Sequence, residues 1–158
     1  MSTQPATTLY DWLLFLHILA ATVWLGGLLI INLQATLVLR DRDPDLVRRF
    51  TRSLRIVGPI ALGPSMLAVL GFGIWMVLHS AAWDFGQAWV VAALGLFAGA
   101  FVIGVGFQAR AAIGAERAAE AGDADEALRQ LRRWAWGMRA IALILVIAVW
   151  DMAAKPGL

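Results

Sequence analysis

Four nearly uninterrupted apolar segments occupy most of this 158-residue chain, at about residues 12–39, 56–78, 88–107 and 135–150. A helix of about 20 apolar residues crosses the hydrocarbon core of a bilayer. Backbone groups in lipid must pair within a helix or a closed barrel, and the alternating pattern of barrel strands is missing here. The segments therefore predict four transmembrane helices.

We predict an all-α, polytopic membrane protein in which residues 1–158 form a single four-transmembrane-helix bundle. Its helices are expected at about residues 11–39, 45–79, 87–115 and 124–154. No basic residue precedes the first segment, which is also longer than the apolar region of a secretory signal, so we expect this helix to be retained. The composition, 61% hydrophobic and 15% charged, is far more apolar than that of water-soluble domains.

The basic residues predict the orientation. Lys155 is the only one of the 13 Lys and Arg residues that lies outside residues 40–55 and 110–139. The positive-inside rule places these two linker regions in the cytoplasm, and both termini and the 79–87 hairpin on the other side. The charge then reflects topology and contact with anionic lipid, so the predicted partner is the lipid bilayer and not nucleic acid.

The linker into the second helix has clear helix signals. Asp43 is a suitable N-cap, and Pro44 suits the first helical position. We expect Leu46, Val47 and Phe50 to face lipid while the neighbouring arginines meet headgroups. The Gly-Pro pairs at 58–59 and 63–64 predict a kink within the membrane.

His17 is the main candidate for function. It lies about 9 Å below the outer edge of the first helix, at 1.5 Å per residue, and shares one helix face with Ala20, Trp24 and Gly27. The small residues could leave room for a flat ligand that His17 binds, since ionisable groups in membrane helices are functional by default. The alternative is a buried histidine bonded to a carbonyl or a serine of a neighbouring helix.

Two further groups are expected at the same depth. Asp151 and Lys155 stand four residues apart on one face of the fourth helix. They could form a self-neutralising pair from which Lys155 reaches the interface. Alternatively, Asp151 could orient His17 or relay a proton.

Metal binding is a third possibility. Met76 and His79 are three residues apart, and Met152 could approach from the fourth helix; thioether and imidazole ligands suit Cu(I). A headgroup contact at the interface is the preferred interpretation of His79, although it could also clamp a haem together with His17, as helices of a bundle can. The chain has no cysteine, and no motif of a known catalytic site is found.

Several runs resemble known families. FLHILAATVWLGG, GIWMVL, FGQAWV and DMAAKP together resemble a family of bacterial predicted integral membrane proteins of unknown function, over nearly the whole chain. More remotely, His17, Trp24, the following Gly-Gly pair and Lys155-Pro156 are similar to the HemJ-type protoporphyrinogen oxidases, which have four helices and bind haem b. The first helix also resembles CopD-type copper-resistance membrane proteins.

These resemblances imply a protein of the bacterial inner membrane that binds haem b or a porphyrin through His17, with Lys155 as a partner. The candidate cofactor-binding residues are His17, Trp24, Gly27, Asp151 and Lys155, and the candidate metal ligands are His17, Met76 and His79. HemJ-type chains carry a Tyr-, Pro- and Arg-bearing stretch where this chain reads LLIINLQATLVL, so the oxidase activity is not implied. The alternatives are a copper-handling protein, or a structural or assembly subunit without cofactor that binds itself or another membrane protein.

Overall fold

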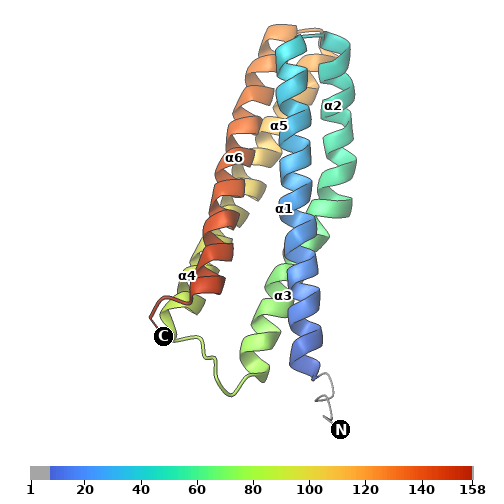
Figure 1. Cartoon of the computed structure of the whole chain (residues 1–158). Helices are drawn as coiled ribbons and strands as arrows, with labels where there is room; N and C mark the ends of the chain where they lie inside the picture. Colours follow the sequence, from blue (N-terminus) through green and yellow to red (C-terminus); the bar gives the residue numbers. More distant parts are fainter. Residues whose placement is uncertain (1–7, 158) are drawn as a thin grey trace.

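The computed structural model describes residues 8–157, and within this range the chain is helical and contains no strand. Four helical spans, each long and apolar enough to cross a membrane, run up and down in one elongated bundle (Figure 1). This confirms the predicted all-α fold with four membrane-spanning helices. Large apolar side chains remain exposed along all four spans, as expected where lipid replaces water.

The first and fourth spans are continuous helices, whereas the second and third are each built from three pieces. α1 covers Leu9–Asp41 and α6 covers Ala124–Ala154. The second span comprises α2 (Pro44–Val57), η1 (Gly58–Leu62) and α3 (Gly63–His79). The third comprises α4 (Ala88–Val102), η2 (Ile103–Gln108) and α5 (Ala109–Glu120), and so extends beyond the expected end near residue 115.

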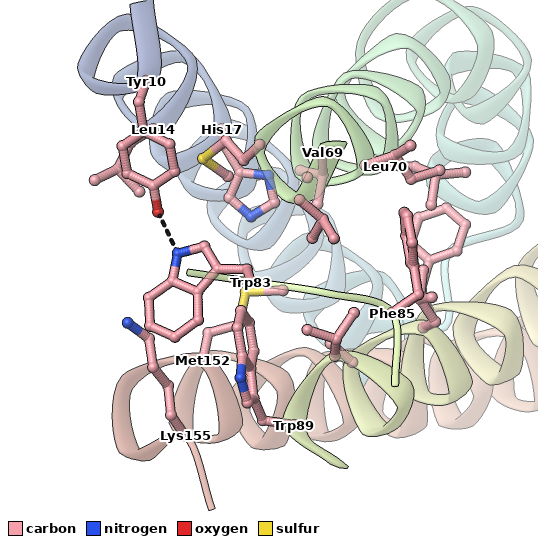
Figure 2. A pocket seen from close by; sticks show the side chains of 18 residues that line it. Tyr10, Leu14, His17, Val69, Leu70, Trp83, Phe85, Trp89, Met152 and Lys155 are labelled. Carbon is pink, nitrogen blue, oxygen red and sulfur yellow. Dashed lines mark hydrogen bonds between the residues drawn. The ribbon is translucent and has the colours of Figure 1, made fainter. Parts of the chain in front are cut away.

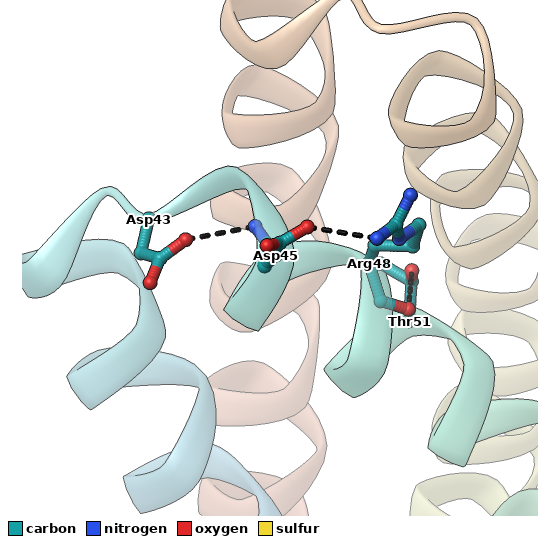
Figure 3. Close-up of polar contacts among 4 residues, drawn as sticks. All are labelled: Asp43, Asp45, Arg48 and Thr51. Carbon is teal, nitrogen blue, oxygen red and sulfur yellow. Dashed lines mark hydrogen bonds and ion pairs between the residues drawn. The ribbon is translucent and has the colours of Figure 1, made fainter.

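Short-range hydrogen bonds set where the helices begin. Thr8 caps α1 in a reciprocal pair with Asp11, whose carboxylate accepts from the Thr8 backbone amide at 2.8 Å. Asp43 caps α2 by accepting from the Asp45 amide at 2.8 Å, and Asp45 then pairs with Arg48 at 2.8 Å (Figure 3). Each cap satisfies amides that have no partner inside the helix.

α2 differs from the expectation that its apolar face meets lipid. Val47 and Phe50 are buried in the bundle, and Phe50 packs edge-on against Trp134 of α6 with ring centroids 5.8 Å apart. Leu46 alone of the three remains exposed. The prediction was wrong because an apolar helix face can be buried equally well against lipid or against protein.

Both middle spans change to π-helical hydrogen bonding near their midpoints. η1 begins at Gly58-Pro59, where the proline removes a backbone donor and disturbs the α-helical ladder. η2 contains no proline and was not anticipated; it includes Gly104 and Gly106 and ends at the buried Gln108. Such π segments interrupt helices at sites where the backbone has to be redirected.

The helices pack unevenly along the bundle. We call the end with the helix boundaries Leu9 and Ala154 and the 80–87 loop the terminal end, and the opposite end the linker end (Figure 1). Most of the buried core lies toward the linker end, where alanines such as Ala35, Ala115 and Ala135 let α1, α5 and α6 approach closely. At the terminal end α3 packs along α1 and α4 along α6, but α3 and α4 have no comparable contact with each other.

Candidate functional site

A cavity of about 220 Å³ lies at the terminal end, in the space that α3 and α4 leave between them (Figure 2). The 80–87 loop crosses from α3 to α4 and contributes Trp83 and Phe85 to its wall. Ile74 and Phe85 line the cavity and are also exposed on the outside. The cavity therefore opens toward the surroundings of the bundle beside α3.

Apolar side chains form nearly all of the cavity wall. Its polar members are an imidazole, an ammonium group, a phenol and two indoles, and no carboxylate is among them. The lining residues are Tyr10, Leu14, His17, Val69, Leu70, Gly73, Ile74, Met76, Val77, Trp83, Phe85, Trp89, Val90, Ala93, Leu94, Phe97, Met152 and Lys155.

His17 is 6% exposed and reaches the cavity from α1. One edge of its ring lies on α3: a Cβ atom at Gly73 would be 3.2 Å from Cε1 and 3.5 Å from Nδ1. Nδ1 makes no hydrogen bond that meets normal geometry, although the backbone of Val69 lies on this side within reach of the ring. Figure 2 shows the other ring nitrogen facing the interior of the cavity.

This placement suits the imidazole for holding a ligand. A histidine that binds a metal or polar ligand through one nitrogen commonly directs the other toward a backbone carbonyl, which selects the tautomer. Here the Nδ1 edge faces backbone and Nε2 is the atom left to meet a ligand. The structure thus shows a buried histidine beside the backbone of α3, and the ligand-binding hypothesis concerns the opposite edge of the same ring.

Lys155 closes the terminal end of the cavity. Its Nζ lies 4.2 Å from the ring centroid of Trp83 and 5.7 Å from that of Trp89. The two indoles meet edge to face with centroids 5.3 Å apart. Trp83 also donates from Nε1 to the Tyr10 hydroxyl at 3.1 Å, so the loop is tied to α1 as well as to the end of α6.

Asp151 does not pair with Lys155 within the described part of the chain, so the self-neutralising pair is not formed there. The Asp151 side chain is 4% exposed, and its Oδ2 has no hydrogen-bond partner in that range. Only its backbone carbonyl contacts Lys155, by accepting the amide that ends α6 at 2.8 Å. Asp151 is not part of the cavity wall.

Trp24 and Gly27 pack against neighbours outside the cavity. Trp24 is 4% exposed and meets Phe97 at 6.0 Å between ring centroids, so it supports one wall from behind. Gly27 lies under Leu62, whose Cδ2 would be 3.0 Å from an added Cβ. The small residue on this face thus gives room to a side chain of η1.

The soft candidate ligands are divided between the cavity and the surface. Met76 and Met152 line the cavity together with His17. His79, in contrast, is exposed and outside the cavity wall. No group of three or more His, Cys, Asp or Glu side chains able to hold a metal is found within residues 8–157.

Trp83 and Phe85 of the 80–87 loop and Gly73 of α3 also line the cavity beside His17. The sequence did not indicate that these residues belong to the site. Tryptophans such as Trp83 and Trp89 are common near membrane interfaces, so nothing in the sequence marked them or Tyr10 as residues of a site. A tryptophan five residues before a helix start gives no signal that it will meet a lysine 72 positions away along the chain, since only the path of the loop brings them together.

Comparison with known proteins gives one match. The model of a family described as "Predicted integral membrane protein (DUF2269)" matches residues 11–156. No curated protein and no solved structure matches the chain.

Proposed function

This chain belongs to the DUF2269 family of predicted integral membrane proteins, and on that basis we propose that it binds a hydrophobic small molecule in the cavity beside His17. The observation that carries the proposal is a buried imidazole on the wall of a largely apolar cavity. A polar group at membrane depth is costly unless it is partnered. A ligand with one polar atom could bond to Nε2, the ring nitrogen that faces the cavity (Figure 2), while its apolar body fills the cavity.

The shape of the bundle supports access from the bilayer. α3 and α4 do not pack on each other at the terminal end, and exposed residues beside this gap also line the cavity. A hydrophobic ligand dissolved in lipid can therefore reach His17 without passing through water.

Haem b is the ligand implied by the resemblance to HemJ-type proteins, and His17 is the residue that would hold it. Imidazole and thioether groups are both axial haem ligands, and Met76 and Met152 line the cavity with His17. Bound haem would supply one-electron chemistry. However, about 220 Å³ is below the about 300–1,000 Å³ of typical small-molecule sites, so the cavity does not enclose a complete macrocycle. We therefore rank a smaller ligand first.

Copper handling is the second candidate, because three soft donors line one cavity. Thioether and imidazole ligands suit Cu(I), and the set supported by the structure is His17, Met76 and Met152. His79 lies elsewhere, on the exposed part of α3. The copper proposal therefore keeps Met76 and Met152, which the sequence had suggested, and uses His17 in place of His79.

We also propose that the terminal end faces away from the cytoplasm of a bacterial cell, with the protein in its inner membrane. The two linkers rich in arginine lie together at the opposite end, as the positive-inside rule requires. The chain has no cysteine, so single cysteines can report the orientation. An impermeant maleimide added to intact spheroplasts should label Ser80→Cys and leave Asp123→Cys unlabelled; the reverse pattern would refute this orientation.

Binding can be tested with dodecanol, a neutral amphiphile, titrated into protein-containing nanodiscs by calorimetry, with empty nanodiscs as the partition control. We expect saturable binding that is weakened in His17→Ala. Ala93→Phe should abolish it by filling the cavity, because Ala93 is buried on the wall. Ala92→Phe is the matched control, since Ala92 is exposed on the same helix. Wild-type uptake equal to that of empty nanodiscs, or full binding by Ala93→Phe, would refute the proposal and favour a structural role.

The same preparations separate the two cofactor candidates. Haem binding predicts a Soret band after addition of hemin that is lost in His17→Ala. Copper binding predicts stoichiometric copper that is lost in Met152→Leu but retained in His79→Ala. An unchanged Soret band in His17→Ala would rule out haem ligation by this residue.

A further inference from the structure

The charges on the cavity wall are all of one sign. The wall contains the ammonium group of Lys155 and the titratable imidazole of His17, but no Asp or Glu side chain. Among the described residues, the ion pairs are Arg48–Asp45, Arg55–Glu116 and Arg129–Glu126, and none involves Lys155. A ligand in this cavity therefore meets an apolar surface with a cation at one end.

Lys155 contacts two indole rings, and these contacts do not neutralise its positive charge. Its Nζ lies over the Trp83 ring at 4.2 Å, with Trp89 at 5.7 Å. The face of an indole attracts a cation but carries no net negative charge. A partly buried ammonium group still gains from a true counter-ion, and a ligand with an anionic head could supply one.

We propose that the ligand is an amphiphile with a carboxylate head, of the fatty-acid class, and that Lys155 binds this head at the mouth of the cavity. The inference rests on the proposed binding of a hydrophobic ligand beside His17 and adds the charge of the head. The head lies near Trp83 and Trp89, and the chain extends past His17 toward the gap between α3 and α4. Charge complementarity favours an anion, and the small volume of about 220 Å³ favours a single chain over a large ring system.

A porphyrin could supply the same chemistry, since it also joins carboxylates to an apolar body. The cavity of about 220 Å³ favours the fatty acid, because typical sites for compact small molecules are larger. A ligand with a quaternary ammonium head is a further alternative, in which the head is positively charged. It could displace Lys155 from the two indoles. These ligands differ in charge and shape, so matched probes distinguish them.

The test compares dodecanoate, dodecanol and dodecyltrimethylammonium, which share one chain and differ in head charge. Each is titrated into protein-containing and empty nanodiscs at about pH 8.5, where a carboxyl group is ionised and lysine is protonated. We expect dodecanoate to bind about tenfold more tightly than dodecanol, as a charge-assisted contact predicts. Lys155→Met should remove this difference between dodecanoate and dodecanol, and Lys155→Arg should retain it.

The outcomes separate this inference from the proposed function. Equal affinities for dodecanoate and dodecanol in the wild type, or a difference that persists in Lys155→Met, would overturn the carboxylate proposal while cavity binding stands. Tighter binding of dodecyltrimethylammonium would overturn it in favour of a cationic head. Failure of all three probes to bind above the partition control would instead refute cavity binding itself.

A second pair of probes identifies the source of the carboxylate. Protoporphyrin IX and its dimethyl ester differ only in the charge of two side chains. If Lys155→Met affects the porphyrin pair and not the dodecyl pair, the fatty-acid assignment is overturned and a porphyrin takes its place. If it affects the dodecyl pair alone, the fatty-acid assignment is supported.

Discussion

The imidazole of His17 on α1 lies directly against the backbone of Gly73 on α3. A methyl group at Gly73 would be 3.2 Å from Cε1 of the ring, so the absence of a side chain at this position lets the edge of the ring formed by Cε1 and Nδ1 approach α3. The contact holds the Nδ1 edge toward α3 and leaves Nε2 for the cavity. A residue with no side chain thus orients the principal candidate for ligand binding.

Gly73→Ala should weaken ligand binding with little effect on stability. Displacing the ring from its position costs about 1 kcal/mol, which corresponds to about a fivefold loss of dodecanol affinity. Alanine also favours the helix by about 1 kcal/mol, so the melting temperature should change little. Calorimetry and thermal unfolding measure the two effects. Gly71→Ala is the control, because nothing lies within 4 Å of its added Cβ; equal affinities in the two variants would contradict the prediction.

Gly137→Ala should destabilise the bundle at the end of η2. The added Cβ would lie 2.9 Å from Oε1 of Gln108 and 3.0 Å from Cδ1 of Phe107. Gln108 is buried and cannot move aside freely, so overpacking should cost about 1–3 kcal/mol. The melting temperature of Gly137→Ala should recover in part when it is combined with Gln108→Ala. Gly99→Ala is the control, because an added Cβ there meets no atom within 4 Å, and it should leave stability unchanged. If Gly99→Ala lost as much stability as Gly137→Ala, the loss at Gly137 would not be due to steric overlap.

Phe50→Ala should be strongly destabilising because α2 is part of the core. Phe50 is buried against Trp134, and removal of a buried aromatic ring costs about 3–5 kcal/mol. Leu46→Ala, at an exposed position of the same helix, should cost less than about 0.5 kcal/mol. Thermal unfolding in detergent compares the two variants. If α2 instead lay on the membrane surface with both side chains in lipid, the two losses would be alike.

The hydrogen bond between Trp83 and Tyr10 should help to hold the 80–87 loop over the cavity. Trp83→Phe and Tyr10→Phe each remove one partner of the 3.1 Å contact while keeping an aromatic ring. Each should raise hydrogen exchange in residues 80–87, and a double-mutant cycle should give a coupling of about 0.5–1.5 kcal/mol. Additive effects of the two changes would show that the bond does not contribute.

The helical spans were predictable because their cause is local. A span needs only enough consecutive apolar residues to cross the bilayer, and Asp43 and Asp123 mark helix starts through hydrogen bonds to residues at most three positions away. The same local logic predicted that Pro59 would disturb the second span. η2 escaped prediction because no residue in Ile103–Gln108 forbids an ordinary α-helix.

The sequence by itself determined four apolar helices, the clustering of arginine at the two linkers, and a histidine among apolar residues, since length, charge and spacing are properties of neighbouring residues. Only the tertiary structure decided that α3 and α4 separate, that Gly73 accommodates His17, and that Lys155 turns to Trp83 and away from Asp151. The reason is physical: in lipid, every face of an apolar helix is equally acceptable outside, so hydrophobicity does not choose which face turns inward. That choice comes from close packing between segments far apart in the chain.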